Sequence, residues 1–474
     1  MSDQHTPVTP DLDTIRYAPT DGLTYNPNDP KYWDKAALEK EIERTFELCH
    51  GCRMCFKFCQ SFPTLFNAVD THGDVRRIPE STRRQVIDQC FQCKLCYTQC
   101  PYTDAEGHEF KLDFPRLILR ANAVRRKDEG IPLRERLLGN PDALARLARP
   151  TAALANFANT FRPHRILMEK VMGIHRDKLL PSFAATSFEQ WVRREEARAP
   201  ASQSQGDKVV LFATCFVNHN RPEVGQAAYR VLRHSGCNVA CPSLTCCGMP
   251  ALDGGDVAFA IRQARDNVRA LLPFVEQGYK VAVLNPTCSL MLRQEYPELL
   301  DDPADRPVAE AARQVAAATR DACEFLFDLR KEGRFKEDFK STPAGNVAYH
   351  APCHLRMQNV GFRGRDLMRR IPQVKPVLTA ECCGHDGTWA MKTEYFPLAM
   401  KNGSKAFEGM RDAEADLWAT DCPLAALQFE QACGKKALHP IEVLDRAYRE
   451  DGFPTPIRPD AGDAAAPSAP AAGA

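Results

Sequence analysis

The chain has 474 residues, of which 26% are charged, and its net charge at neutral pH is +1. This length allows two to four domains, and the balanced charge excludes the strongly basic proteins that bind nucleic acid through their phosphates. The chain contains 20 cysteines, an unusually high number. Because the N-terminal segment lacks the basic and apolar stretches of a secretory signal, we expect free thiolates in the reducing cytoplasm rather than disulfides.

No apolar run approaches the roughly 18–20 residues that a membrane-spanning helix needs. The longest run, residues 209–213, has the length of a buried strand. Any membrane contact is therefore expected to be peripheral, at the inner face of the membrane, or to be made through another subunit.

Two runs of four cysteines near the N-terminus share the spacing C-x2-C-x2-C-x3-C. Three thiolates at this spacing fit one four-iron cluster, whereas the fourth, at the start of the next helix, reaches the other cluster. A zinc site needs only two C-x2-C pairs and would leave half of each run unexplained. We therefore predict two [4Fe–4S] clusters with crossed ligands: Cys49, Cys52, Cys55 and Cys100 for cluster 1, and Cys90, Cys93, Cys96 and Cys59 for cluster 2.

The segments around these cysteines have helical patterns. Residues 1–35 are predicted to be an irregular lead, residues 36–48 a helix, and residues 110–127 a second helix with Pro115 near its first turn. Another helix is expected to begin at Pro79. Residues 36–127 thus form a small α-helical domain. Residues 128–206 are predicted to be helices interrupted by prolines, and their end, from residue 199, has the composition of a linker.

The remainder of the chain contains an internal repeat. In each copy an apolar run leads into a cysteine, a Cys-Cys-Gly triplet follows, and a second apolar run leads into another cysteine. The offsets between matched cysteines are 138, 136 and 134 residues, for Cys215 and Cys353, Cys246 and Cys382, and Cys288 and Cys422. Such regularity predicts a duplicated α/β unit over residues 207–335 and 345–455. Residues 456–474 have low complexity and are predicted to be disordered.

Each copy places its cysteines after short strands or at glycine-bearing turns, where ligand sites gather in α/β sheets. A glycine behind two adjacent cysteines lets both thiolates face one metal centre while the backbone turns sharply. We therefore predict one metal site per copy, formed by Cys215, Cys246, Cys247 and Cys288 in the first and by Cys353, Cys382, Cys383 and Cys422 in the second.

At these residues the chain resembles the heterodisulfide-reductase-related iron–sulfur subunits with two CCG (cysteine-rich) domains behind a two-cluster ferredoxin domain. The C subunit of anaerobic glycerol-3-phosphate dehydrogenase and the iron–sulfur subunit of glycolate oxidase are members. The resemblance covers about residues 45–450 and rests on both cysteine runs, both Cys-Cys-Gly triplets and residues 439–448. It implies an α+β multidomain fold with an N-terminal α-helical two-cluster ferredoxin domain, a helical linker and two repeated α/β CCG domains.

The family closes each CCG site with C-x-x-C, and both copies depart from this pattern. Asn285 occupies the first position in the first copy, so that only Cys288 remains, and Ala425 occupies the second position after Cys422. The departures argue against the five-thiolate cluster that the family uses for disulfide chemistry. Four thiolates still suffice for a further iron–sulfur cluster or for zinc, and both cofactors remain open for either CCG site.

The resemblance implies an electron-transfer subunit of a glycerol-3-phosphate or 2-hydroxy-acid dehydrogenase type of complex. Electrons would pass from a partner flavoprotein dehydrogenase through the two [4Fe–4S] clusters to the CCG sites, and on to quinone or another acceptor. The chain has neither a G-x-G-x-x-G fingerprint nor a P-loop, so the organic cofactor is expected on the partner. The alternatives are a catalytic disulfide or heterodisulfide-type reductase and a redox or oxidative-stress-linked iron–sulfur protein. No catalytic residue is assigned.

Two further features remain open. His350, His354 and His385 neighbour the second CCG site, and we interpret them as structural or hydrogen-bonding groups in preference to ligands. Between Lys111 and Lys170, thirteen lysines and arginines stand against six acidic residues. This surface either contacts anionic lipid or an acidic partner, or is an ordinary solvated helix face.

Overall fold

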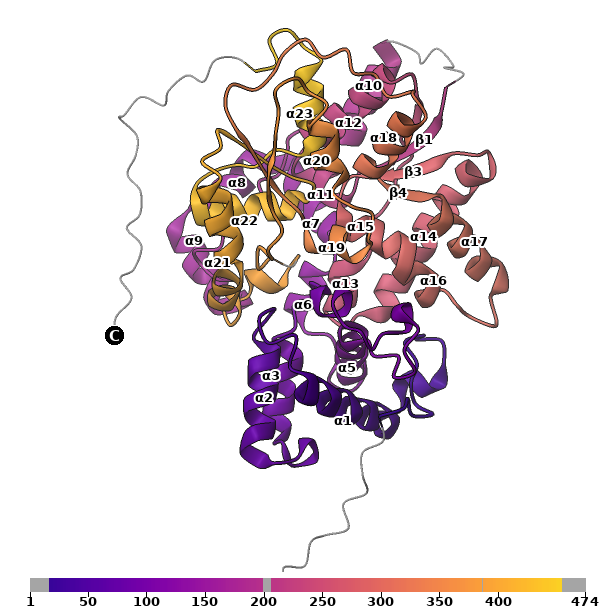
Figure 1. The fold of residues 1–474 in the computed structure, drawn as a ribbon, viewed down its shortest axis with the longest axis vertical. Helices are drawn as coiled ribbons and strands as arrows, with labels where there is room; N and C mark the ends of the chain where they lie inside the picture. Colours follow the sequence, from indigo (N-terminus) through magenta and orange to yellow (C-terminus); the bar gives the residue numbers. More distant parts are fainter. Residues whose placement is uncertain (1–16, 199–205, 386, 454–474) are drawn as a thin grey trace, which may run out of the picture.

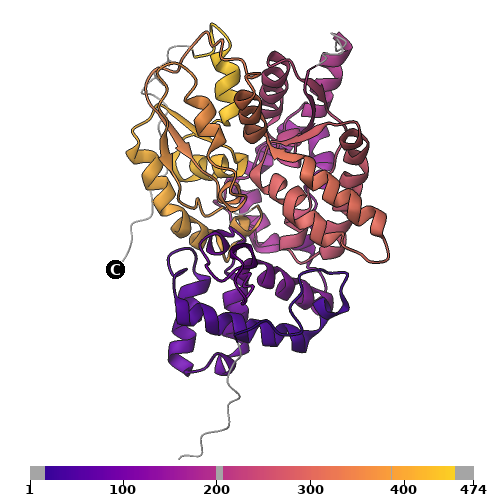
Figure 2. The same ribbon diagram turned by 45° about the vertical axis from the view of Figure 1, so that its right-hand side comes forward.

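The computed structural model describes residues 17–198, 206–385 and 387–453; the predicted disordered tail and most of the predicted linker lie outside these ranges. A helical N-terminal domain lies below two lobes that stand side by side (Figures 1 and 2). The described residues are mainly helical and contain two small parallel sheets, one in each repeat. This confirms the α+β class and the duplicated α/β unit, whereas the ferredoxin character of the N-terminal domain stays a prediction.

The N-terminal domain packs five helices around one core. They are α1 (Lys35–Cys52), α2 (Ser61–His72), α3 (Glu80–Asp88), α4 (Leu95–Thr98) and α5 (Phe114–Glu129). Helix α1 continues to Cys52, beyond its predicted end. Helix α5 begins at Phe114 and not at Phe110, because the Asp113 side chain caps it and Pro115 occupies its first turn. Cys59 precedes α2 as expected, but Cys100 precedes turns and a 3-10 helix (Asp104–Glu106) instead of the predicted helix start.

The described part of the N-terminal lead, residues 17–34, consists of turns and one 3-10 helix (Pro30–Trp33) and is firmly held. The buried guanidinium of Arg120 donates hydrogen bonds to the carbonyl oxygens of Gly22 and Tyr32 at 2.7 and 2.8 Å. Asn26 donates to the carbonyl oxygen of Asp301 at 2.7 Å. The lead therefore joins the N-terminal domain to the first repeat.

The segment between the N-terminal domain and the repeats is helical and contacts both repeats. Its helices are α6 (Leu133–Leu138), α7 (Pro141–Ala148), α8 (Ala152–Thr160), α9 (Arg162–Met172) and α10 (Phe188–Arg198). After α9, Ile174 forms a β-bridge with Lys392 of the second repeat. The chain then returns, and Ala184 donates to the carbonyl oxygen of His219 in the first repeat at 2.8 Å. None of the helices in the described ranges combines the length and apolar character needed to cross a membrane.

The first repeat is a parallel sheet covered on both faces. The strand order is β2 (Asn238–Ala240), β1 (Lys208–Phe212), β3 (Lys280–Val283) and β4 (Thr319–Asp321). Alternate side chains of β1 enter two different cores: Val209 and Leu211 pack with α12 (Pro222–His234) and α18 (Ala322–Lys331), whereas Val210 and Phe212 pack with α14 (Val257–Glu276) and α17 (Arg306–Ala318). This arrangement explains why the apolar runs are continuous and not alternating.

The second repeat has the parallel strand order β6 (Val377–Thr379), β5 (Val347–His350) and β7 (Leu417–Thr420). An isolated bridge between Ala419 and Leu438 stands where the first repeat has β4. The helices of this repeat include α20 (Arg363–Met368), α21 (Phe396–Asp412), α22 (Pro423–Cys433) and α23 (Pro440–Ala447).

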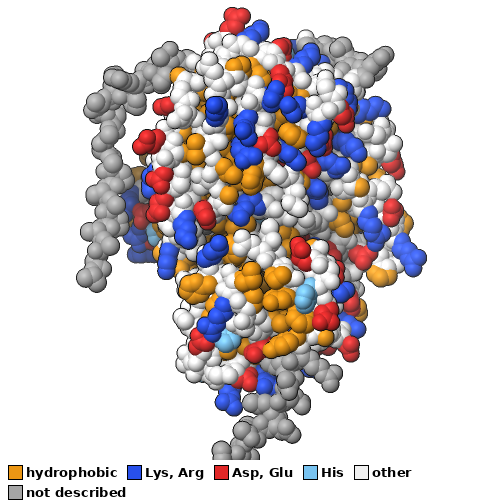
Figure 3. Space-filling model, viewed as in Figure 1, with side chains coloured by type: hydrophobic (Ala, Val, Ile, Leu, Met, Phe, Trp, Pro, Cys, Tyr) orange, Lys and Arg blue, Asp and Glu red, His pale blue; other side chains and the backbone are white. Residues whose placement is uncertain are grey.

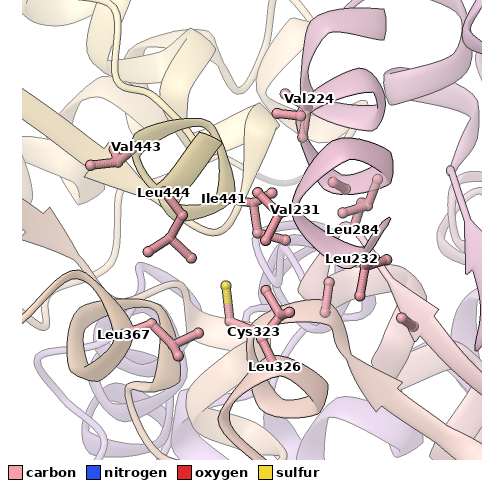
Figure 4. Packing of buried hydrophobic residues seen from close by; sticks show 14 of the residues in the cluster. Val224, Val231, Leu232, Leu284, Cys323, Leu326, Leu367, Ile441, Val443 and Leu444 are labelled. Atoms are coloured by element: carbon pink, nitrogen blue, oxygen red, sulfur yellow. The ribbon is translucent and has the colours of Figure 1, made fainter. Parts of the chain in front are cut away.

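The two repeats share one hydrophobic core. Helices α12 and α18 of the first repeat pack against α20 and α23 of the second, and side chains such as Val231, Leu326, Leu367 and Leu444 meet around Cys323 (Figure 4). At the edge of this core, the Arg230 guanidinium donates to both carboxylate oxygens of Asp445 at 2.8 and 2.7 Å. The core fixes the orientation of the two repeats.

Candidate metal centres

The cysteines of the N-terminal domain lie in two groups. The outer group consists of Cys49, Cys52, Cys55 and Cys100, which line one cavity together with Cys96 and are all partly exposed. Burial raises the pKa of the Cys49 thiol, and the neighbouring thiols of this group raise it further. The structure thus brings together the four residues predicted to bind cluster 1.

The inner group consists of Cys59, Cys90, Cys93 and Cys96. Burial raises the pKa of Cys90, and the neighbouring thiols of Cys59 and Cys93 add to this effect. The Gln92 side-chain amide donates to the Cys90 sulfur at 3.5 Å. These are the residues predicted for cluster 2, and Cys59 lies among them, although it also neighbours Cys55 of its own run. The occupation of both groups by clusters stays a prediction.

The second-repeat group consists of Cys353, Cys382, Cys383 and Cys422. Cys353 begins the short helix α19 (Cys353–Met357) after β5, the Cys-Cys-Gly triplet follows β6, and Cys422 follows β7. Gly384 has a φ of +70°, and a Cβ atom there would collide with the carbonyl oxygen of Ala399 in α21. Only glycine therefore allows this turn to hold both thiols against the helix.

The first-repeat group consists of Cys215, Cys246, Cys247 and Cys288, and its sulfurs are in close contact. The sulfurs of Cys215 and Cys246 are 3.6 Å apart. Hydrogen bonds from the thiols of Cys215 and Cys247 lower the pKa of Cys246 to about 5. Hydrogen bonding within the group thus lowers the pKa of Cys246 and raises the pKa values of Cys215 and Cys247.

The strand ends correct one equivalence drawn from the sequence. Asn285 lies two residues after β3 and caps α15 (Pro286–Leu290), and Cys422 lies two residues after β7 and caps α22. Asn285 is therefore the counterpart of Cys422, and Cys288 is the counterpart of Ala425. The offset of 134 residues paired Cys288 with Cys422 wrongly, by three positions. The first repeat keeps the second cysteine of the C-x-x-C pattern, Cys288, and the second repeat keeps the first, Cys422.

The donor chemistry of all four groups fits iron–sulfur clusters or zinc, because clustered thiolates bind both. His350 and His354 are not free to join them. His350 contacts the Thr420 hydroxyl and the Glu381 carbonyl oxygen, both at 3.0 Å, whereas His354 contacts the Thr287 hydroxyl and the Gln92 carbonyl oxygen at 2.8 and 2.7 Å. Burial lowers the pKa of both rings to about 4, so both are neutral.

A buried lysine that the sequence did not indicate lies beside the second-repeat group. Lys178, from the segment after α9, is 2% exposed, and its ammonium donates to the Gln428 side chain at 2.6 Å. Burial lowers its pKa to about 8, although the Cys383 thiol acts in the opposite direction. Among the described residues no carboxylate pairs with it, so its charge acts on the cysteines.

The four groups are joined in a fixed order. The Cys55 sulfur lies 3.9 Å from the Cys96 carbonyl oxygen, which links the outer to the inner group. Cys93 packs in the same cluster as Cys382 and lines the same cavity as Cys353 and Cys383, which links the inner to the second-repeat group. The helices α15 and α19, side by side above the N-terminal domain, bring the first-repeat group next to the second-repeat group through Thr287 and His354 (Figure 1).

Another buried polar cluster lies between the repeats, where donor atoms of Cys323, Asp421 and His439 are within 4.8 Å of one another. His439 Nδ1 accepts a hydrogen bond from the Ile441 backbone, and Asp421 accepts one from the Tyr349 hydroxyl. Because these bonds serve helix capping and strand contacts, we assign the cluster to the packing of the two repeats.

Comparisons with known proteins agree with this arrangement. The model of the CCG family, described as a cysteine-rich domain, matches residues 209–293 and 347–430. The chain is 30% identical over 413 residues to the C subunit of anaerobic glycerol-3-phosphate dehydrogenase from Escherichia coli K12, covering 85% of this chain and 99% of that protein. It is 29% identical over 262 residues to the B subunit of fumarate reductase (CoM/CoB) from Methanothermobacter marburgensis, covering 52% and 48% of the two chains.

Lactate utilization protein A of Geobacillus kaustophilus is 32% identical over 221 residues, covering 45% of this chain and 87% of that protein. The two matches to the cysteine-rich domain coincide with the two repeats and with the sheets that hold their cysteines. The near-complete coverage of the dehydrogenase protein extends the likeness to the N-terminal domain. The chain therefore belongs to the family of CCG-domain iron–sulfur proteins that includes the C subunit of anaerobic glycerol-3-phosphate dehydrogenase.

Proposed function

We propose that the protein is the electron-transfer subunit of a dehydrogenase complex, and that electrons pass from a flavoprotein partner to the outer group, the inner group, the second-repeat group and the first-repeat group. Iron–sulfur clusters, when bound, take up and release single electrons. The observation that carries the proposal is the contact between the Cys93 and Cys382 thiols, which joins the N-terminal domain to the second repeat. The names of the relatives, subunits of a dehydrogenase and a reductase, support the same role.

The outer group is suited to meet the partner. Its four thiols are partly exposed, and Met54 and Phe56 beside them are 55% and 60% exposed. Hydrophobic side chains gather on the face of the N-terminal domain that is turned to the viewer in Figure 3. An exposed apolar patch beside a redox centre favours docking of another subunit.

The proposal is tested on anaerobically purified protein by iron, sulfide and zinc analysis and by a redox titration followed by EPR. Two four-iron clusters in the N-terminal domain require about eight irons per chain, and clusters in the repeats raise this number. A reducible EPR signal should accompany them. Protein with stoichiometric zinc and iron near zero would refute electron transfer.

Replacing Lys178 with Met is expected to lower the midpoint potential of the second-repeat centre, because an uncompensated positive charge favours the reduced state. Two unit charges separated by about 8 Å at an effective dielectric constant of about 20 interact by about 2 kcal/mol, which for one electron is about 90 mV, so we expect a shift of tens of millivolts. The EPR redox titration measures this shift. Replacing Lys436, which is exposed, should leave the potential unchanged; an equal shift in both variants would contradict the role of Lys178.

For the final acceptor we propose a membrane quinone, reached by peripheral binding to the inner face of the membrane. Helices α6 to α9 expose apolar side chains to an unusual degree: Leu133, Leu137, Leu147, Leu154, Phe157, Phe161, Leu167 and Val171. Leu147 and Val171 are 79% and 70% exposed. Residues 133–172 also carry seven lysines and arginines against three acidic residues. Apolar side chains among basic ones match an anionic lipid surface.

Replacing Leu154, Phe157, Leu167 and Val171 together with Gln is expected to weaken binding to vesicles containing anionic lipid by at least about tenfold, because each side chain contributes on the order of 1 kcal/mol when buried. Co-sedimentation with anionic and with neutral vesicles measures the effect. The matched control replaces Val377 and Leu378, which are exposed on β6 of the second repeat. Equal binding by both variants, or binding of wild type only to a partner subunit, would contradict membrane docking.

A further inference from the structure

His385 differs from the other two histidines near the second-repeat group. Both of its ring nitrogens are shielded from solvent, and neither forms a hydrogen bond within the described ranges. His350 and His354, in contrast, have both nitrogens engaged. Burying polar atoms without hydrogen-bond partners is unfavourable, so a partner is expected for this ring.

The ring lies where a metal centre would provide that partner. His385 lines the same cavity as Cys353, Cys383 and Cys422, and it follows Cys383 by two residues in the chain. Ala425 lines the cavity as well and is 1% exposed. This alanine occupies the position of the second cysteine of the C-x-x-C pattern, so the cavity lacks one thiolate of that pattern and is lined by an unpartnered imidazole.

The first repeat differs from the second at the residue that follows the Cys-Cys-Gly triplet. Met249 follows its Cys-Cys-Gly triplet at the position of His385 and is buried in the hydrophobic core, 2% exposed. The first repeat retains Cys288 at the position of Ala425. Each repeat therefore has one further donor beside its other cysteines: a thiol in the first and an imidazole in the second.

We infer that His385 is a nitrogen ligand of the metal centre in the second repeat, in the place of the missing thiolate. The inference rests on the proposed function in that this group must hold a metal. Neutral imidazole binds both iron and zinc. Where histidine replaces cysteine at an iron–sulfur cluster, the reduction potential rises. The second-repeat centre is thus expected to accept electrons more readily than an all-thiolate site would.

The test is pulsed EPR of the reduced protein, which detects a nitrogen nucleus bound directly to a cluster by its strong hyperfine coupling. We expect this coupling in the wild type, its loss in the variant His385→Met, and its retention in His350→Gln and His354→Gln. Met is the residue that the first repeat tolerates at this position. The variant His385→Cys should keep the cluster, lose the nitrogen coupling and shift the midpoint potential downward.

X-ray absorption covers the case in which the site holds zinc, since one nitrogen among sulfur ligands is then expected in the wild type and none in His385→Met. An all-sulfur shell in the wild type, with iron or with zinc, overturns the inference and leaves the proposed function intact. Nitrogen coupling that persists in His385→Met, or that disappears in His354→Gln, also overturns it. A second repeat without any metal overturns the inference together with the proposed path.

Discussion

Replacing Cys59 with Ala is expected to abolish the same EPR signal as replacing Cys90, and replacing Cys100 the same signal as replacing Cys49. The reason is that Cys59 lies among the thiols of the inner group, whereas Cys100 lies in the outer cavity. Each change should lower the iron content by about four atoms per chain. Loss of the inner group should also stop the reduction of the centres in the repeats by a donor at the outer group.

This result separates crossed from uncrossed ligands. Uncrossed ligands predict that Cys59→Ala and Cys49→Ala remove one common signal. The matched control is Cys237→Ala, because Cys237 is buried and belongs to none of the four groups. Its iron content and electron transfer should equal those of the wild type. If the repeats are still reduced at the normal rate without the inner group, the order of the path is wrong.

Replacing Lys94 with Met is expected to destabilise the protein by about 3 kcal/mol, because it leaves a buried carboxylate without its nearest cation. The Lys94 ammonium lies 2.5 Å from the Glu295 carboxylate, and both residues are buried. Arg116, at 3.6 Å, compensates only in part. Anaerobic urea denaturation measures the loss. The pair joins the loop of the inner group to the first repeat, so the contact between the N-terminal domain and the first repeat should weaken as well.

The double variant Lys94→Met, Glu295→Leu removes both charges and should recover most of the stability. Acid provides a second check. Burial acts to raise the pKa of Glu295, but Lys94 and Arg116 outweigh it and lower the pKa to about 2. A lowered pKa stabilises the fold above the ordinary range near 4.5, and this contribution disappears as the pH falls toward 2. The double variant, which has no carboxylate at position 295, should lack this pH-dependent contribution to stability. A loss below about 1 kcal/mol in Lys94→Met would contradict the assignment.

Local patterns predicted much of the fold and of the candidate sites. The strands leading to Cys215, Cys288, Cys353 and Cys422 follow from short apolar runs, and β1, β3, β5 and β7 lie at these runs. The duplication follows from the Cys-Cys-Gly triplets. Glycine was informative because the turn at Gly384 tolerates no side chain. Such features depend on neighbours in the chain and are therefore visible in the sequence.

Contacts between distant segments were not predictable in this way. The sequence indicates that four groups of cysteines exist, but it does not indicate that the second repeat, and not the first, lies against Cys93. Lys178 carries no motif, and its effect arises only because the segment after α9 crosses to the second repeat. The offset between Cys288 and Cys422 misaligned the copies because their loops differ in length, whereas the ends of the strands agree with the C-x-x-C pattern and pair Asn285 with Cys422.

The core that α12 and α18 share with α20 and α23 has a consequence for how the two copies diverge. Neither copy has a complete hydrophobic core of its own. If the copies were separated, each would expose side chains of the shared core, such as Leu326 and Leu444. Fragments produced by fission of the gene between the copies would therefore each expose this apolar surface, which favours aggregation. The metal-binding turns lie outside this joint. Asn285 and Ala425 are the result: the two halves share one core, whereas each half keeps its own set of thiols.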